Sequence, residues 1–233
     1  KPEIYAIGVR ADNEERHVAN FSLFYQVLLE NKVKSENIYI LTDDRKEQYY
    51  HPVVDIASRE SLAKLFMHLS KKIDEKDKFI FYFDGHGYSV PFILHGEEEI
   101  YLSGFNLKNR SVNEIELEFY FSTIKAKEKI LVFDCCHDGG FAQRLGKENT
   151  IVLSSSGLPQ EKSFASPHDS FSGFFFKAFR KNSGADSNND RFTSILEAYN
   201  FAKENHLSSK RKFQNPQLGY DKNKIDPSKV GLN

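Results

Sequence analysis

Two strongly apolar segments, each running directly into a polar turn that contains glycine, constrain the fold of this chain more than any other feature. Residues 79–83 lead into Asp84-Gly85-His86-Gly87, and residues 130–133 lead into Asp134-Cys135-Cys136-His137-Asp138-Gly139. Such runs of branched and aromatic residues are typical of strands buried on both faces of a parallel sheet. Both turns should therefore emerge at the carboxyl edge of one sheet, where open α/β folds place their sites.

The remaining pattern alternates strands with helices. Further strands are predicted at residues 4–9, 37–41, 150–154 and 216–220. Helices are predicted at residues 15–31, from Ser58 or Ser61 to residue 72, and at residues 113–126, 171–179 and 192–207. Residues 91–94 and 100–102 should form a small hairpin beside the main sheet, joined by residues 95–99. This order predicts an α/β fold, a three-layer α/β/α sandwich around a mostly parallel six-stranded sheet.

Length and charge limit the classes of function. The 233 residues are enough for one substantial core, and residues 1–233 are expected to form a single domain. The 32 Lys and Arg nearly balance the 33 Asp and Glu, so we expect no nucleic-acid partner and no membrane partner. No apolar stretch approaches the roughly 20 residues that cross a bilayer. The only two cysteines are adjacent, which favours a reducing compartment and predicts a cytoplasmic location.

The two polar turns contain the parts of a cysteine-based catalytic site. Strand alternation places Cys136 on the same side as Asp134, whereas Cys135 should pack inward. We therefore predict that Cys136 is the nucleophile. His86, flanked by glycines, would accept the thiol proton and donate a proton to the departing amine. The backbone N–H groups of Gly87 and Cys136 are expected to form the oxyanion hole.

Other interpretations of these residues are possible. A lone cysteine or histidine more often packs in a core, but the two together at adjacent strand ends favour catalysis. Cys135, Cys136 and His137 resemble a metal-binding set. Consecutive side chains of an extended segment diverge, however, so we expect no metal and no cofactor. His137 could replace His86 as the base, although a residue next to Cys136 should point away from the thiol.

At these two turns the chain resembles the caspase-like cysteine peptidases, the group of caspases, metacaspases, legumains and clostripain-type enzymes. Asp84-Gly85-His86-Gly87 is similar to the histidine turn, and Asp134-Cys135-Cys136-His137-Asp138-Gly139 is similar to the Asp-x-Cys-His-Ser-Gly turn of metacaspases, the closest subgroup in motif. Asp84 and Asp138 each stand where metacaspases usually carry serine. Weaker similarities extend over most of the chain.

The resemblance implies a caspase-like fold and a hydrolase that cleaves peptide bonds of a protein or peptide substrate through a Cys136/His86 dyad and an acyl-enzyme. It also implies a substrate-binding pocket lined by Asp84 and Asp134. Two carboxylates would favour Lys or Arg immediately before the scissile bond. Asp84 could instead accept hydrogen bonds from nearby backbone N–H groups. Asp12, just after the first strand, could add a third acidic wall.

Two alternative functions remain open at this point. One is a legumain-like peptidase that cleaves after Asn, and the other is a caspase-like regulatory module without turnover. The resemblance also allows an activating partner or a fused regulatory domain. The polar residues 181–190 could be a cleavable linker, flanked by Arg180 and Arg191, or an ordinary surface loop. No Asp cluster matches the calcium site of some metacaspases, so no metal requirement is expected.

Overall fold

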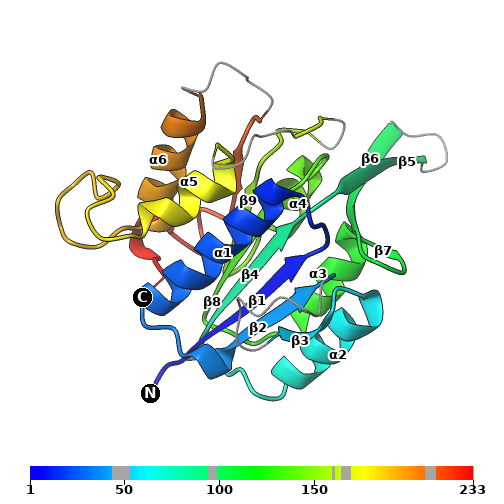
Figure 1. The fold of residues 1–233 in the computed structure, drawn as a ribbon, viewed down its shortest axis with the longest axis horizontal. Helices are drawn as coiled ribbons and strands as arrows, with labels where there is room; N and C mark the ends of the chain where they lie inside the picture. Colours follow the sequence, from blue (N-terminus) through cyan, green and yellow to red (C-terminus); the bar gives the residue numbers. More distant parts are fainter. Residues whose placement is uncertain (44–52, 94–98, 159–160, 164–168, 208–213, 233) are drawn as a thin grey trace.

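A seven-stranded sheet with helices on both faces forms the centre of the molecule (Figure 1). The computed structural model describes residues 1–43, 53–93, 99–158, 161–163, 169–207 and 214–232. The order of the strands across the sheet is β10-β9-β8-β4-β1-β2-β3. The α/β/α class predicted from the sequence is confirmed.

All neighbouring strands of this sheet run parallel except β10, which is antiparallel to β9. The strands are β1 (Ile4–Arg10), β2 (Ile38–Thr42), β3 (Val53–Ile56), β4 (Lys78–Asp84), β8 (Glu128–Asp134), β9 (Thr150–Ser154) and β10 (Gln217–Gly219). The structure thus has one strand more than the predicted six. The additional strand, β3, is a four-residue edge strand that lacks the long apolar run of the central strands.

Each face of the sheet has its own apolar core. One face is covered by α1 (Glu15–Glu30), α5 (Phe171–Ala178) and α6 (Ile195–Leu207), and the other by α2 (Arg59–Leu69), α3 (Glu114–Ser122) and α4 (Gly139–Leu145). Alternation along β4 directs Ile80 and Tyr82 into the first core and the phenylalanines at positions 79, 81 and 83 into the second. Because β4 is buried on both faces, polar side chains such as Asp84 can occur only where the strand ends.

A second, three-stranded antiparallel sheet begins directly after the histidine turn. It consists of β5 (Gly87–Ile93), β6 (Glu99–Asn106) and β7 (Ser111–Asn113). The predicted hairpin is therefore present but longer than its apolar residues indicated, and residues 94–98 of its connection lie outside the described residues. Since β4 ends at Asp84 and β5 starts at Gly87, His86 lies at the junction of the two sheets.

Local sequence signals explain where several helices begin. The Ser58 hydroxyl accepts a hydrogen bond from the Ser61 N–H at the start of α2, and the Asn113 side chain accepts one from the Glu116 N–H at the start of α3. Helix α4 was not predicted, because it starts with Gly139-Gly140 and glycine is a poor helix former. Close packing explains this sequence: a Cβ atom on Gly139 would lie 2.6 Å from backbone atoms of residues 157 and 158.

The carboxyl-terminal residues return to the core on the α1/α5/α6 face. Val230 and Leu232 are buried there, and the Ile195 N–H donates to the Val230 carbonyl over 2.7 Å. Among the described residues, none of the helices combines the length and apolarity needed to span a membrane.

Candidate active site

The parallel pairing of β4 and β8 brings the two polar turns together. Asp84 and Asp134 are partners in the register of this pair, so each turn leaves the sheet at the same level. The Gly85 N–H donates to the Asp134 carbonyl at 3.4 Å. A Cβ atom added to Gly87 would lie only 1.9 Å from the Cys136 carbonyl oxygen. The histidine turn and the cysteine turn are therefore in direct contact, and only glycine fits at position 87.

The two adjacent cysteines occupy different environments, as strand alternation indicated. Cys135 is completely buried, and this burial raises the pKa of its thiol well above the ordinary value, so it remains protonated. Cys136 is only half-buried, and its Sγ donates a hydrogen bond to the Ser163 carbonyl over 3.2 Å. Of the two sulfur atoms, that of Cys136 is the one open to a substrate.

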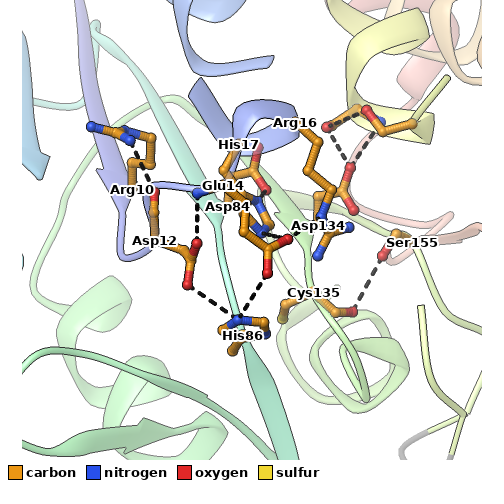
Figure 2. A network of polar contacts seen from close by, with 12 residues as sticks. Arg10, Asp12, Glu14, Arg16, His17, Asp84, His86, Asp134, Cys135 and Ser155 are labelled. Carbon is orange, nitrogen blue, oxygen red and sulfur yellow. Dashed lines mark hydrogen bonds and ion pairs between the residues drawn. The ribbon is translucent and has the colours of Figure 1, made fainter. Parts of the chain in front are cut away.

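His86 projects from its turn toward the segment that follows β1 (Figure 2). Its side chain is 52% exposed, and its Nε2 lies 3.1 Å from Asp12 Oδ2 and 3.8 Å from Glu14 Oε1. The structure thus places Asp12, considered as an additional wall of the substrate pocket, beside the candidate catalytic imidazole.

Asp138 organises the turn that follows Cys136. Its buried carboxylate accepts hydrogen bonds from five donors, which are the backbone N–H groups of Cys135, Ser155 and Ser156 and the hydroxyls of Ser155 and Ser156. Burial nevertheless raises the pKa of Asp138 to about 7. His137 adopts a left-handed conformation (φ 65°), and its N–H donates to the Glu161 carbonyl. These contacts fix the main chain on both sides of Cys136.

Asp84 and Asp134 are both completely buried at the ends of their strands. Asp84 contacts the His17 imidazole and accepts a hydrogen bond from the Tyr82 hydroxyl, so its partners are side chains. Asp134 accepts hydrogen bonds from the N–H and hydroxyl of Ser172 and from the Gln214 amide. We use the name acidic recess for these two carboxylates and the protein side chains packed around them.

The acidic recess also contains two basic residues that sequence reasoning missed. The buried Arg16 reaches toward Asp134, and the fully buried His17 lies against Asp84 (Figure 2). Burial alone would lower the pKa of His17, but the Asp84 carboxylate outweighs it and the pKa is raised. Arg16 and His17 lie four residues before Asn20 and Phe21 on α1. This spacing places Arg16 and His17 on the same buried face of the helix as Asn20 and Phe21, and it is the sequence signal that could have revealed them.

One group of described residues offers ligand atoms close enough together to hold a metal ion. The side chains of Asp12, Glu14 and His86 offer ligand atoms that all lie within 4.8 Å of one another. Separately, Asp186, Asn188, Asp190 and Glu197 occupy positions 1, 3, 5 and 12 of a calcium-loop spacing. Arg191, at the sixth position where such loops carry glycine, adopts a left-handed conformation (φ 68°). This spacing begins within the polar residues 181–190, for which a cleavable linker or a surface loop was predicted. It indicates a possible calcium loop, which was not predicted.

The fold and the two contacting turns define a caspase-like protein. A family model described as "Caspase domain" matches residues 23–223, and the chain therefore belongs to the caspase domain family of peptidases. No curated protein matches the chain. Among solved structures, the chain is similar to protein GSU0716 from Geobacter sulfurreducens, with a TM-score of 0.62 and 13% sequence identity over 98% of this chain and 99% of that one. That similarity concerns the fold.

Proposed function

We propose that the protein is a cysteine endopeptidase that cleaves peptide bonds through Cys136, His86 and an acyl-enzyme. The observation that carries this proposal is the direct contact of the two turns at Gly87, which keeps a half-exposed thiol and a half-exposed imidazole at one sheet edge. Membership in the caspase domain family supports the same reaction class.

The proposed reaction follows from the groups at this edge. His86 removes the Cys136 proton, and the sulfur, released from its contact with the Ser163 carbonyl, attacks the substrate carbonyl carbon. The N–H groups of Gly87 and Cys136 stabilise the oxyanion. The protonated His86, stabilised by Asp12, then gives its proton to the departing amine. Water, activated by His86, hydrolyses the acyl-enzyme and restores the thiol.

We propose Lys or Arg as the residue before the scissile bond, because Asp84 and Asp134 provide two buried carboxylates near the nucleophile. The guanidinium of Arg16 already lies beside Asp134 (Figure 2), so it is the group that a substrate cation would have to displace. A substrate cation would take the place of Arg16 in the recess. One observation favours a second candidate, cleavage after Asn: Arg16 and a protonated His17 would balance both carboxylates and leave a neutral recess with polar Ser172 and Gln214.

Mutation of the nucleophile tests the reaction. We expect Cys136→Ala to lower cleavage of Arg- and Lys-amide reporters at least ~1,000-fold, because the acyl-enzyme cannot form. The matched variant Cys135→Ala removes a buried thiol that does not face substrate and should retain most of the activity. Iodoacetamide followed by peptide mass spectrometry should label Cys136. Labelling of Cys135 alone, or an active Cys136→Ala protein, would contradict the assignment.

The same assay separates the specificities when Arg, Lys, Asn and Asp reporters are compared under identical conditions. Preference for Arg and Lys supports a recess that binds a cation, and preference for Asn supports the neutral recess. A chain that is alkylated at Cys136 but cleaves none of the reporters would support the regulatory-module alternative.

A further inference from the structure

Three potential zinc ligands, Asp12, Glu14 and His86, offer atoms within 4.8 Å of one another, and the imidazole of His17 lies next to this group. His86 Nε2 lies 3.1 Å from Asp12 Oδ2 and 3.8 Å from Glu14 Oε1. Ligand atoms bound tetrahedrally to one zinc ion at about 2.0–2.1 Å are roughly 3.3 Å apart. The observed separations lie on either side of this value, so small side-chain rotations would bring these atoms to the zinc-binding geometry.

His17 supplies an independent indication of a ligand. Its ring is fully buried, Nδ1 is bound to the Asp84 carboxylate, and Nε2 has no hydrogen-bond partner among the described residues. Nε2 instead faces the cluster, 3.9 Å from Glu14 Oε2. A histidine that gives its Nδ1–H to a carboxylate presents the Nε2 lone pair to a metal, which is the usual outer-shell arrangement of zinc sites. A bound cation would satisfy this buried nitrogen.

The loop that carries the acidic ligands is held in place. The buried Arg10 donates to the Asp12 carbonyl and to the Asn13 side chain, each at 2.9 Å, and to the Thr42 hydroxyl at 2.8 Å. Asp12 Oδ1 accepts a hydrogen bond from the Glu14 N–H at 2.7 Å, and its other oxygen faces His86. The site is therefore largely formed before any ion binds.

We propose that Asp12, Glu14, His17 and His86 form a zinc-binding site. Two neutral imidazoles and two carboxylates match the ligand types of zinc, and the carboxylates balance its charge. The ring centroids of His17 and His86 lie 6.0 Å apart, a separation that allows both rings to bind one ion. Glu14 Oε2 also lies 3.4 Å from Arg16 Nε, so Glu14 exchanges this contact for the metal when zinc binds.

Zinc at this site would inhibit the protein. His86 cannot accept or donate a proton while its Nε2 is bound to a metal. This consequence rests on the proposed peptidase function, whereas binding itself does not. Zinc binding and zinc inhibition are therefore measured separately.

Binding is tested by calorimetric titration of the Cys136→Ala chain with zinc chloride, so that the nucleophilic thiol cannot supply a ligand. We expect one zinc ion per chain. Glu14→Gln, introduced into the same background, should weaken the affinity at least ~10-fold, because an amide is a much poorer zinc ligand. The control is Glu15→Gln, which neutralises the exposed neighbouring carboxylate and should leave the affinity unchanged. Equal thermal melting of the variants shows that each is folded.

Cobalt in place of zinc identifies the ligand atoms. The chain with its native cysteines should give tetrahedral cobalt absorption without a sulfur-to-metal charge-transfer band, because the site contains only nitrogen and oxygen ligands. A charge-transfer band, loss of zinc binding in Cys136→Ala, or equal affinity in Glu14→Gln would overturn the proposal. If zinc binds as expected but no reporter is cleaved, the site stands and the peptidase function fails.

Discussion

At the scale of single residues, Asp138 determines the conformation of the main chain around the candidate nucleophile. It accepts five hydrogen bonds from three residues, Cys135, Ser155 and Ser156, and it stands where the similar turn of metacaspases carries serine. A serine side chain has a single oxygen and could not accept hydrogen bonds from all five donors, which the two carboxylate oxygens of Asp138 share. These contacts therefore hold the turn around Cys136 through a carboxylate.

The raised pKa of Asp138 predicts how its replacement changes pH-dependent stability. Burial raises this pKa to about 7, so the folded chain retains a proton that the unfolded chain loses near pH 4. The stabilising contribution is complete below pH ~4 and is lost as the pH rises through 7. The Asp138→Asn variant has no titrating group at this position. Between pH ~4 and pH ~7 its free energy of unfolding should therefore fall by less than that of the wild type, the difference being on the order of 4 kcal/mol.

This difference is measured by urea unfolding at several pH values. Asp169→Asn, which changes an exposed carboxylate, should follow the wild-type pH dependence. Parallel pH profiles for the wild type and Asp138→Asn would show that Asp138 is ionised throughout and would contradict the raised pKa.

Residue positions were predictable from the sequence where one strand or one turn determines them. Alternation along a single strand was enough to separate the buried Cys135 from the accessible Cys136. The pairing of His17 with Asp84 joins residues 67 positions apart, and helical spacing alone does not reveal which strand end a helix faces. For this reason two carboxylates were predicted in the recess, but its two basic residues were not.

At the scale of helices and strands, side-chain caps mark where several of the described helices begin. Asn113 accepts a hydrogen bond from the Glu116 N–H at 3.0 Å, as its spacing predicted. The Glu116 side chain does not complete a reciprocal capping box, because it binds Arg59 and accepts a hydrogen bond from the Tyr120 hydroxyl. Glu116 therefore links α3 to α2 in addition to following the cap.

Removal of this cap has a defined effect. Asn113→Ala should lower the free energy of unfolding by about 1 kcal/mol, because the Glu116 N–H loses its acceptor. Chemical denaturation measures the change. Asn223→Ala, an exposed position outside any helix, is the control and should leave stability within about 0.5 kcal/mol of the wild type. Equal stabilities of the two variants would show that the cap contributes nothing.

The elements that sequence reasoning missed share a physical cause. β3 and β7 contain four and three residues, too few for a periodic pattern to emerge. Helix α4 has the opposite problem, since its glycines oppose helix formation by propensity but are required by close contacts with residues 103, 157 and 158. In each case tertiary packing, which has no local sequence signature, decides the structure.

At the scale of the whole molecule, the last residues of the described chain complete the core formed by the first and later helices. Leu232 is 1% exposed in this core. The neighbouring Gly231 carbonyl accepts a hydrogen bond from Lys78 at the start of β4. The carboxyl-terminal segment therefore contributes to the stability of the domain that contains the candidate site.

Leu232→Ala should lower the free energy of unfolding by about 2–4 kcal/mol, since it opens a cavity in a closed apolar core. The matched substitution Leu29→Ala changes a residue that is 40% exposed on α1 and should lower it by less than about 1 kcal/mol. Thermal or urea unfolding of both variants tests the contribution. A Leu232→Ala protein as stable as Leu29→Ala would mean that the terminal segment is loosely attached.

The missing side chain at Gly87 has a consequence for how relatives of this protein are judged. One methyl group there would meet the main chain of the neighbouring turn at 1.9 Å and force the histidine turn and the cysteine turn apart. A descendant could thus lose the proposed peptide cleavage by a single hydrogen-to-methyl replacement while keeping both candidate catalytic residues intact. Inspecting only the histidine and the cysteine would misclassify such a descendant as an enzyme.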